Sequence, residues 1–135
     1  MKKIILSGFI AGIALLLLSI LGLYLTIWLF PGIAMQYFHP AYDTQSERLV
    51  LYYLSPFLIS FVMSWFWQRF KTLLTDSFLT RGIELGLIYV LIAPLPMIWL
   101  TFSSMHVSLE MAASWLVLSL IQGIAAGLIF EKINP

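Results

Sequence analysis

The sequence contains no cysteine and little charge, with only 10% of its 135 residues being Asp, Glu, Lys or Arg. The absence of cysteine excludes disulfides, thiolate metal ligands and a cysteine nucleophile. A formal net charge of +1 excludes the strongly basic surface that nucleic acids require. The chain also lacks a glycine-rich phosphate loop, a Ser/His/Asp signature and paired catalytic carboxylates. We therefore expect no nucleic-acid partner and no cofactor, and an enzyme is the less favoured class.

Apolar residues are abundant, at 61% of the chain, and the mean hydropathy is +1.00. Soluble domains are usually about half apolar and about a quarter charged. The core of a small soluble domain cannot bury such an excess, whereas lipid can surround it. The composition predicts an all-α integral membrane protein, with residues 1–135 forming a single domain.

Four apolar segments predict membrane-spanning helices. At 1.5 Å per residue, the shortest of them just crosses the roughly 30 Å of hydrocarbon in a bilayer. Pro31 and Gly32 end the first helix, Thr44 and Glu47 fit a capping box before the second, and Ser108 can cap the fourth. The expected fold is a four-transmembrane-helix bundle with spans at about 4–30, 49–67, 82–102 and 109–130.

The distribution of Lys and Arg predicts the orientation of this bundle. Arg48 lies on the side of the bilayer opposite the termini. The positive-inside rule therefore places both termini in the cytoplasm. Six of the seven cations lie on the predicted cytoplasmic side: Lys2, Lys3, Arg69, Lys71, Arg81 and Lys132.

The run from Arg81 through Pro94 and Pro96 to Ser103, followed by Ser114-Trp115 and Gln122-Gly123, resembles small four-helix bacterial membrane proteins without assigned activity. The resemblance implies a multi-pass protein of the bacterial inner membrane. Small multidrug exporters have a similar size and span count, but they carry a membrane carboxylate in the first helix, where this chain has none.

Glycines spaced four residues apart occur on three of the predicted helices. Glycine lets helix backbones approach closely in lipid, although it is also simply frequent in membrane helices. We expect these helices to pack most tightly in the cytoplasmic half, and the spacing leaves open whether the contacts lie within one chain or between copies. The pairs are Gly8 with Gly12, Gly82 with Gly86, and Gly123 with Gly127.

Glu84 is the acidic residue best placed to enter the membrane, where an ionisable group is a functional hypothesis because its burial costs several kcal/mol. Arg81 precedes it by three residues on the same helical face, which favours an ion pair or a position at the interface. The alternative is a proton or cation site formed with Gln122, a residue that more often hydrogen-bonds between helices.

Three prolines fall inside the predicted spans. Pro56, Pro94 and Pro96 each remove a backbone donor and obstruct a carbonyl four residues earlier. Kinks satisfied by neighbouring helices are the expected result, and a broken helix that binds an ion is the alternative.

Each of the two histidines precedes an acidic residue by four positions, His39 before Asp43 and His106 before Glu110. Imidazoles and carboxylates can bind a divalent metal if the two outer loops converge. Solvated loop histidines are the more ordinary interpretation, so a metal site is only a weak candidate.

Three hypotheses follow. The leading one is a structural, accessory or regulatory protein that acts through helix contacts, with membrane lipid and another membrane protein or a second copy as partners. The first alternative is a small homo-oligomeric transporter or channel for a proton-coupled or cationic solute, using Glu84 and Gln122. The second is a membrane-embedded metal-binding protein or enzyme at the outer loops.

Overall fold

The structure of the chain is a computed structural model that describes residues 1–37, 39, 48–75 and 77–135. Helices account for most of these residues, and no β-strand occurs among them. In chain order the elements are α1 (Lys2–Leu29), α2 (Pro31–Tyr37), α3 (Leu49–Phe70), the 3₁₀ turn η3 (Lys71–Leu73), α4 (Phe78–Ile92), α5 (Pro94–Ser104) and α6 (Leu109–Ile133).

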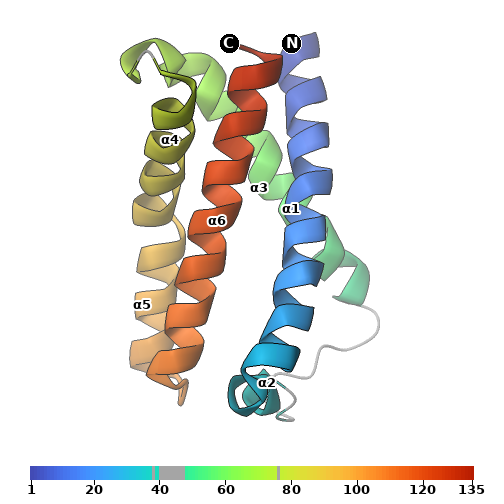
Figure 1. The fold of residues 1–135 in the computed structure, drawn as a ribbon, viewed down its shortest axis with the longest axis vertical. Coiled ribbons are helices and arrows are strands. Elements are labelled where there is room, and N and C mark those ends of the chain that lie inside the picture. Colours follow the sequence, from blue (N-terminus) through green and yellow to red (C-terminus); the bar gives the residue numbers. More distant parts are fainter. Residues whose placement is uncertain (38, 40–47, 76) are drawn as a thin grey trace.

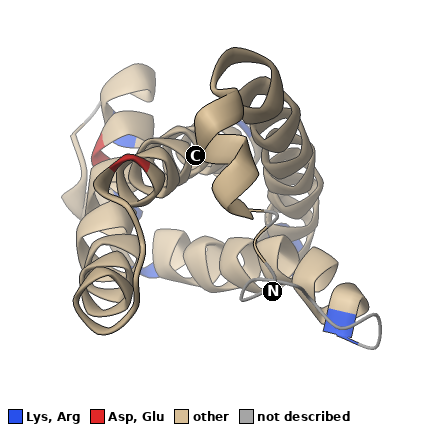
Figure 2. Cartoon of the chain, turned by 90° about the horizontal axis from the view of Figure 1, so that it is seen from below, with Lys and Arg blue, Asp and Glu red and all other residues tan. Residues whose placement is uncertain are grey.

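Within the described residues, four helical segments are long and apolar enough to cross a membrane. This confirms the predicted all-helical class and the number of long apolar helices. Figure 2 shows charged positions as a few short stretches on ribbons that are otherwise tan. The segments are Lys2–Leu29, Leu49–Leu73, Phe78–Ser104 and Leu109–Ile133.

The long helices pack as two pairs that are joined through α6. α4 runs beside α6, and α1 packs against α3, which crosses behind α1 and α6 (Figure 1). Contacts of α6 with α1, and fewer with α3, join the two pairs. Both chain ends lie at the same end of the bundle as the connection between α3 and α4, and this end is called the termini end below.

The buried core lies among α1, α3, α4 and α6. Trp67 and Phe130 are fully buried, with ring centroids 6.3 Å apart. Ala11 and Ala126 are also fully buried, where their small side chains allow the helices to approach. Because Trp67 and Phe130 lie near the ends of α3 and α6, the largest core side chains gather toward the termini end.

Proline has a different effect in each helix. Pro56 is buried inside α3, which continues through it, and the hydroxyl of Ser55 donates to the Tyr52 carbonyl that Pro56 leaves without its N–H partner, at 2.8 Å. Pro94 instead begins a new helix, because α4 ends at Ile92 and α5 starts after Ala93. The third predicted span is therefore two helices in sequence.

The helix ends agree with the sequence at one boundary and differ at another. The predicted cap of the fourth span is confirmed, because Ser108 Oγ accepts the N–H of Met111 at 3.2 Å. Pro31 ends α1 as expected, but it also starts the short helix α2, since proline fits the first position of a helix. The capping box of Thr44 and Glu47 lies outside the described residues.

Candidate functional site

Two glycine pairs meet face to face between α4 and α6. A Cβ added to Gly127 would lie 2.7 Å from the carbonyl oxygen of Gly82, and one added to Gly123 would lie 3.0 Å from the Cα of Gly86. These are backbone atoms, which cannot turn aside as a side chain can. The contact is formed within one chain, and only glycine at these positions lets the two backbones come so close.

The third glycine pair packs against α3, the second predicted span. A Cβ on Gly8 would meet the ring of Phe61 at 2.6 Å, and one on Gly12 would meet Phe57 at 2.5 Å. Beside them, the buried hydroxyls of Ser7 and Ser64 are hydrogen-bonded at 2.7 Å. The sequence did not single out these serines, whose small size and polarity suit them to join closely packed helices.

Gln122 joins α6 to α1. Its side-chain amide donates to the carbonyl oxygen of Leu15 at 3.2 Å and to Ser19 Oγ at 2.8 Å. The Ser19 hydroxyl in turn donates to the same carbonyl at 2.9 Å. A polar side chain in the middle of an apolar helix is thus bonded to the neighbouring helix.

Arg81 and Glu84 take part in a polar network at the termini end. Arg81 Nη1 lies 3.0 Å from both carboxylate oxygens of Glu131 on α6, and its Nε donates to the carbonyl of Thr75 at 2.7 Å. Glu84 accepts hydrogen bonds from the Thr75 N–H at 3.0 Å and from its hydroxyl at 3.1 Å. The spacing in the sequence favours an ion pair of Arg81 with Glu84 or a position at the interface. In the structure, Glu131 of α6 supplies the carboxylate that pairs with the Arg81 guanidinium.

A second polar cluster ties the end of α6 to α3. The indole N–H of the buried Trp67 donates to the carbonyl oxygen of Asn134 at 2.8 Å, and Lys71 Nζ donates to the Asn134 side-chain oxygen at 3.2 Å. Asn134 is 2% exposed and donates to the side chain of Gln68. The available signal in the sequence was the tryptophan itself, because a buried indole N–H needs an acceptor.

The histidines are not assembled into a metal site in the described part of the chain. His39 and His106 are both exposed, as is Glu110, while Asp43 lies outside the described residues. No group of three or more His, Cys, Asp or Glu residues with suitable geometry occurs over residues 1–37, 39, 48–75 and 77–135.

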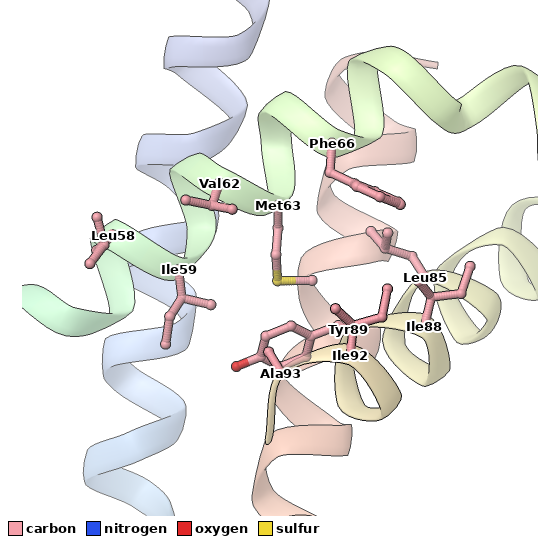
Figure 3. Close-up of a pocket in the computed structure, with 10 residues that line it drawn as sticks. All are labelled: Leu58, Ile59, Val62, Met63, Phe66, Leu85, Ile88, Tyr89, Ile92 and Ala93. Carbon is pink, nitrogen blue, oxygen red and sulfur yellow. The ribbon is translucent and has the colours of Figure 1, made fainter. Parts of the chain in front are cut away.

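An apolar groove lies between α3 and α4. Its volume is about 320 Å³. Figure 3 shows α3 and α4 contributing side chains from opposite sides, with Met63 pointing from α3 toward Tyr89 of α4. The lining consists of Leu58, Ile59, Val62, Met63, Phe66, Leu85, Ile88, Tyr89, Ile92 and Ala93.

Comparison of the chain with protein-family models, curated proteins and solved structures finds no significant match. The functional interpretation therefore depends on the geometry of the chain itself.

Proposed function

We propose that this chain is a multi-pass protein of the bacterial inner membrane, with both termini in the cytoplasm, that acts as a non-enzymatic structural, accessory or regulatory component. The four sufficiently long apolar helices found among the described residues support insertion. The cation distribution supports the orientation, because Arg48 alone among the seven Lys and Arg residues lies on the predicted outer side.

The observation that carries this proposal is that several polar side chains of the helices bond to a neighbouring helix. Gln122 bonds to α1, Arg81 to Glu131 of α6, and Ser7 to Ser64 of α3. Polar groups that bond to a neighbouring helix are not arranged around a route for a solute. Contact with other molecules is then left to the outer helix surfaces and the apolar groove.

The alternative of a transporter is tested directly by ion flux. Gln122 and Glu84 bond to different elements, α1 and the connection before α4, so they do not share one site for a cation. The full chain is reconstituted into lipid vesicles that contain a pH-sensitive dye, and a proton gradient is applied. We expect dissipation at the rate of protein-free vesicles, unchanged by Glu84→Gln or Gln122→Leu. Faster dissipation that Glu84→Gln abolishes would contradict the proposal.

A positive test uses photo-crosslinking in cells. A photoreactive amino acid replaces Leu17 of α1 or Val117 of α6, whose side chains are exposed on the outer faces of the bundle. An accessory protein gives a discrete adduct with another membrane protein from at least one of these positions. Adducts with lipid alone at every outer position tested would oppose the accessory role.

A further inference from the structure

The chemistry of the α3–α4 groove matches a hydrocarbon occupant. Of its ten lining residues, nine have side chains without oxygen or nitrogen, and the tenth contributes only the hydroxyl of Tyr89. A polar ligand buried here would lose its hydrogen bonds to water and regain almost none, at a cost of several kcal/mol. The buried part of any ligand is therefore apolar.

The size of the groove is compatible with an alkyl chain. One water molecule needs only about 10–15 Å³ of a cavity volume of this kind, so about 320 Å³ admits a ligand of many non-hydrogen atoms. A transmembrane helix with its side chains is about 10–12 Å across, so it would lie over the groove and insert only side chains into it. A single acyl chain, which is one methylene wide, fits.

The groove opens to the outside of the bundle, because the lining side chains of Leu58, Val62 and Ile92 are exposed. Phe66 and Leu85 line its part nearest the termini end, where the connection between α3 and α4 lies. In a bilayer, an acyl chain can therefore enter from the lipid phase while its headgroup stays at the surface on the termini side.

Charge at that surface matches an anionic headgroup. Arg69 follows Phe66 by about one helical turn, and its guanidinium lies 5.4 Å from the centroid of the Trp65 ring. Among the residues that the structure describes, Arg69 has no ion-pair partner. Six cations and two carboxylates, Glu84 and Glu131, lie at this end in the described sequence.

We infer that the α3–α4 groove binds one acyl chain of an anionic glycerophospholipid, with the lipid phosphate against Arg69. This site depends on the membrane insertion proposed above. Membrane insertion is measured separately, as the resistance of the protein to extraction from the membrane by alkaline carbonate. A chain that resists extraction but fails the lipid test retains the proposed function and loses only the groove site.

The test is photo-crosslinking from the lipid. The full chain is reconstituted into phosphatidylcholine vesicles that contain a small fraction of phosphatidylglycerol with a diazirine on one acyl chain. The cross-linked residues are then mapped by mass spectrometry. We expect adducts concentrated on residues 58–66 and 85–93. Adducts spread evenly over all the outer helix faces would overturn the site, as would protein-to-protein adducts at the groove residues.

Two pairs of variants separate the acyl chain from the headgroup. Ile88→Trp fills the groove and should abolish the groove adducts, whereas Leu87→Trp, on the exposed other side of α4, should retain them. Arg69→Gln should lower the adduct yield about fivefold, the effect of about 1 kcal/mol for one cation at an anionic surface. Lys132→Gln, at the same end but outside the groove, should lower the yield less than Arg69→Gln does, and an equal effect of the two variants would overturn the assignment of the phosphate to Arg69.

Equal adduct yields from Ile88→Trp and Leu87→Trp would overturn binding in the groove. Equal yields from photoreactive phosphatidylglycerol and phosphatidylcholine, both insensitive to Arg69→Gln, would overturn recognition of the anionic headgroup. Unfolding of each variant is followed in parallel, so that a loss of adducts is compared only among folded proteins.

Discussion

Alanine at Gly127 should force α4 and α6 apart. The new Cβ would lie 2.7 Å from the Gly82 carbonyl oxygen, where ordinary contacts begin at 3.4 Å, so the backbones must separate by about 0.7 Å. A gap of that size forfeits about a quarter to a half of the dispersion energy of the contacts along the seam. Overpacking of this kind costs about 1–3 kcal/mol, and the better helix propensity of alanine returns at most about 1 kcal/mol.

The chain offers two graded controls for this substitution. Alanine at Gly8 would contact the ring of Phe61, which is partly exposed and can turn aside, so its cost should be smaller. Alanine at Gly32 has nothing within 4 Å and should be neutral or stabilising by up to about 1 kcal/mol.

Stability is measured by titrating sodium dodecyl sulfate into mixed micelles and following tryptophan fluorescence, because the buried Trp67 contacts Phe130 near the end of α6. We expect Gly32→Ala to be the most stable variant, Gly8→Ala the next and Gly127→Ala the least stable. Gly127→Ala should lose about 1–2 kcal/mol relative to the unmodified chain. If Gly127→Ala and Gly32→Ala unfold at the same concentration of sodium dodecyl sulfate, the close approach of α4 and α6 does not stabilise the bundle.

Three other contacts give separate predictions. Gln122→Leu removes the hydrogen bonds from α6 to α1 and should cost about 1 kcal/mol in the same titration, while a cost near zero would mean that lipid replaces the contact equally well. Trp67→Phe keeps an aromatic ring but removes the N–H that binds Asn134 and part of the indole volume; it should cost at least about 1 kcal/mol, measured by circular dichroism because the substitution removes the fluorescent probe, and a cost near zero would show that this contact does not stabilise the bundle. Arg81→Gln leaves the Glu131 carboxylate without its guanidinium and should cost about 2 kcal/mol, and adding Glu131→Gln should restore part of that loss; no restoration would show that the two side chains act independently.

Periodicity and composition predicted the helices because they are local properties of the chain. The uninterrupted apolar run of α1 and the Ser108 cap can be recognised in the sequence and are present in the structure. The break at Ala93 is also local, because Pro94 cannot donate the hydrogen bond that would continue α4.

Partner choice between helices could not be predicted, because it depends on how the helices are rotated against one another. Gly8 and Gly12 have the same spacing as the other pairs, yet they contact side chains of α3, whereas Gly82 and Gly127 contact each other. Arg81 illustrates the same limit, since its acceptor Glu131 lies 50 residues away in the sequence.

The groove between α3 and α4 could not be predicted from the sequence either. Its lining residues are ordinary apolar positions on α3 and α4, and the space exists because α3 packs on α1 while α4 packs on α6. Hydropathy gives the same value to a leucine that faces lipid and to one that lines a groove.

Cysteine accessibility tests the proposed membrane topology most directly, and the chain is suited to it because it has no native cysteine. Ser77→Cys places a thiol before α4 at the termini end, and Ser103→Cys places one near the end of α5 at the other end; both positions are exposed. In intact spheroplasts, a membrane-impermeant maleimide reaches only the outer side of the inner membrane. It should label Ser103→Cys at once and Ser77→Cys only after the membrane is permeabilised. Labelling of both thiols in intact spheroplasts, or of Ser77→Cys alone, would contradict four spans with both termini in the cytoplasm.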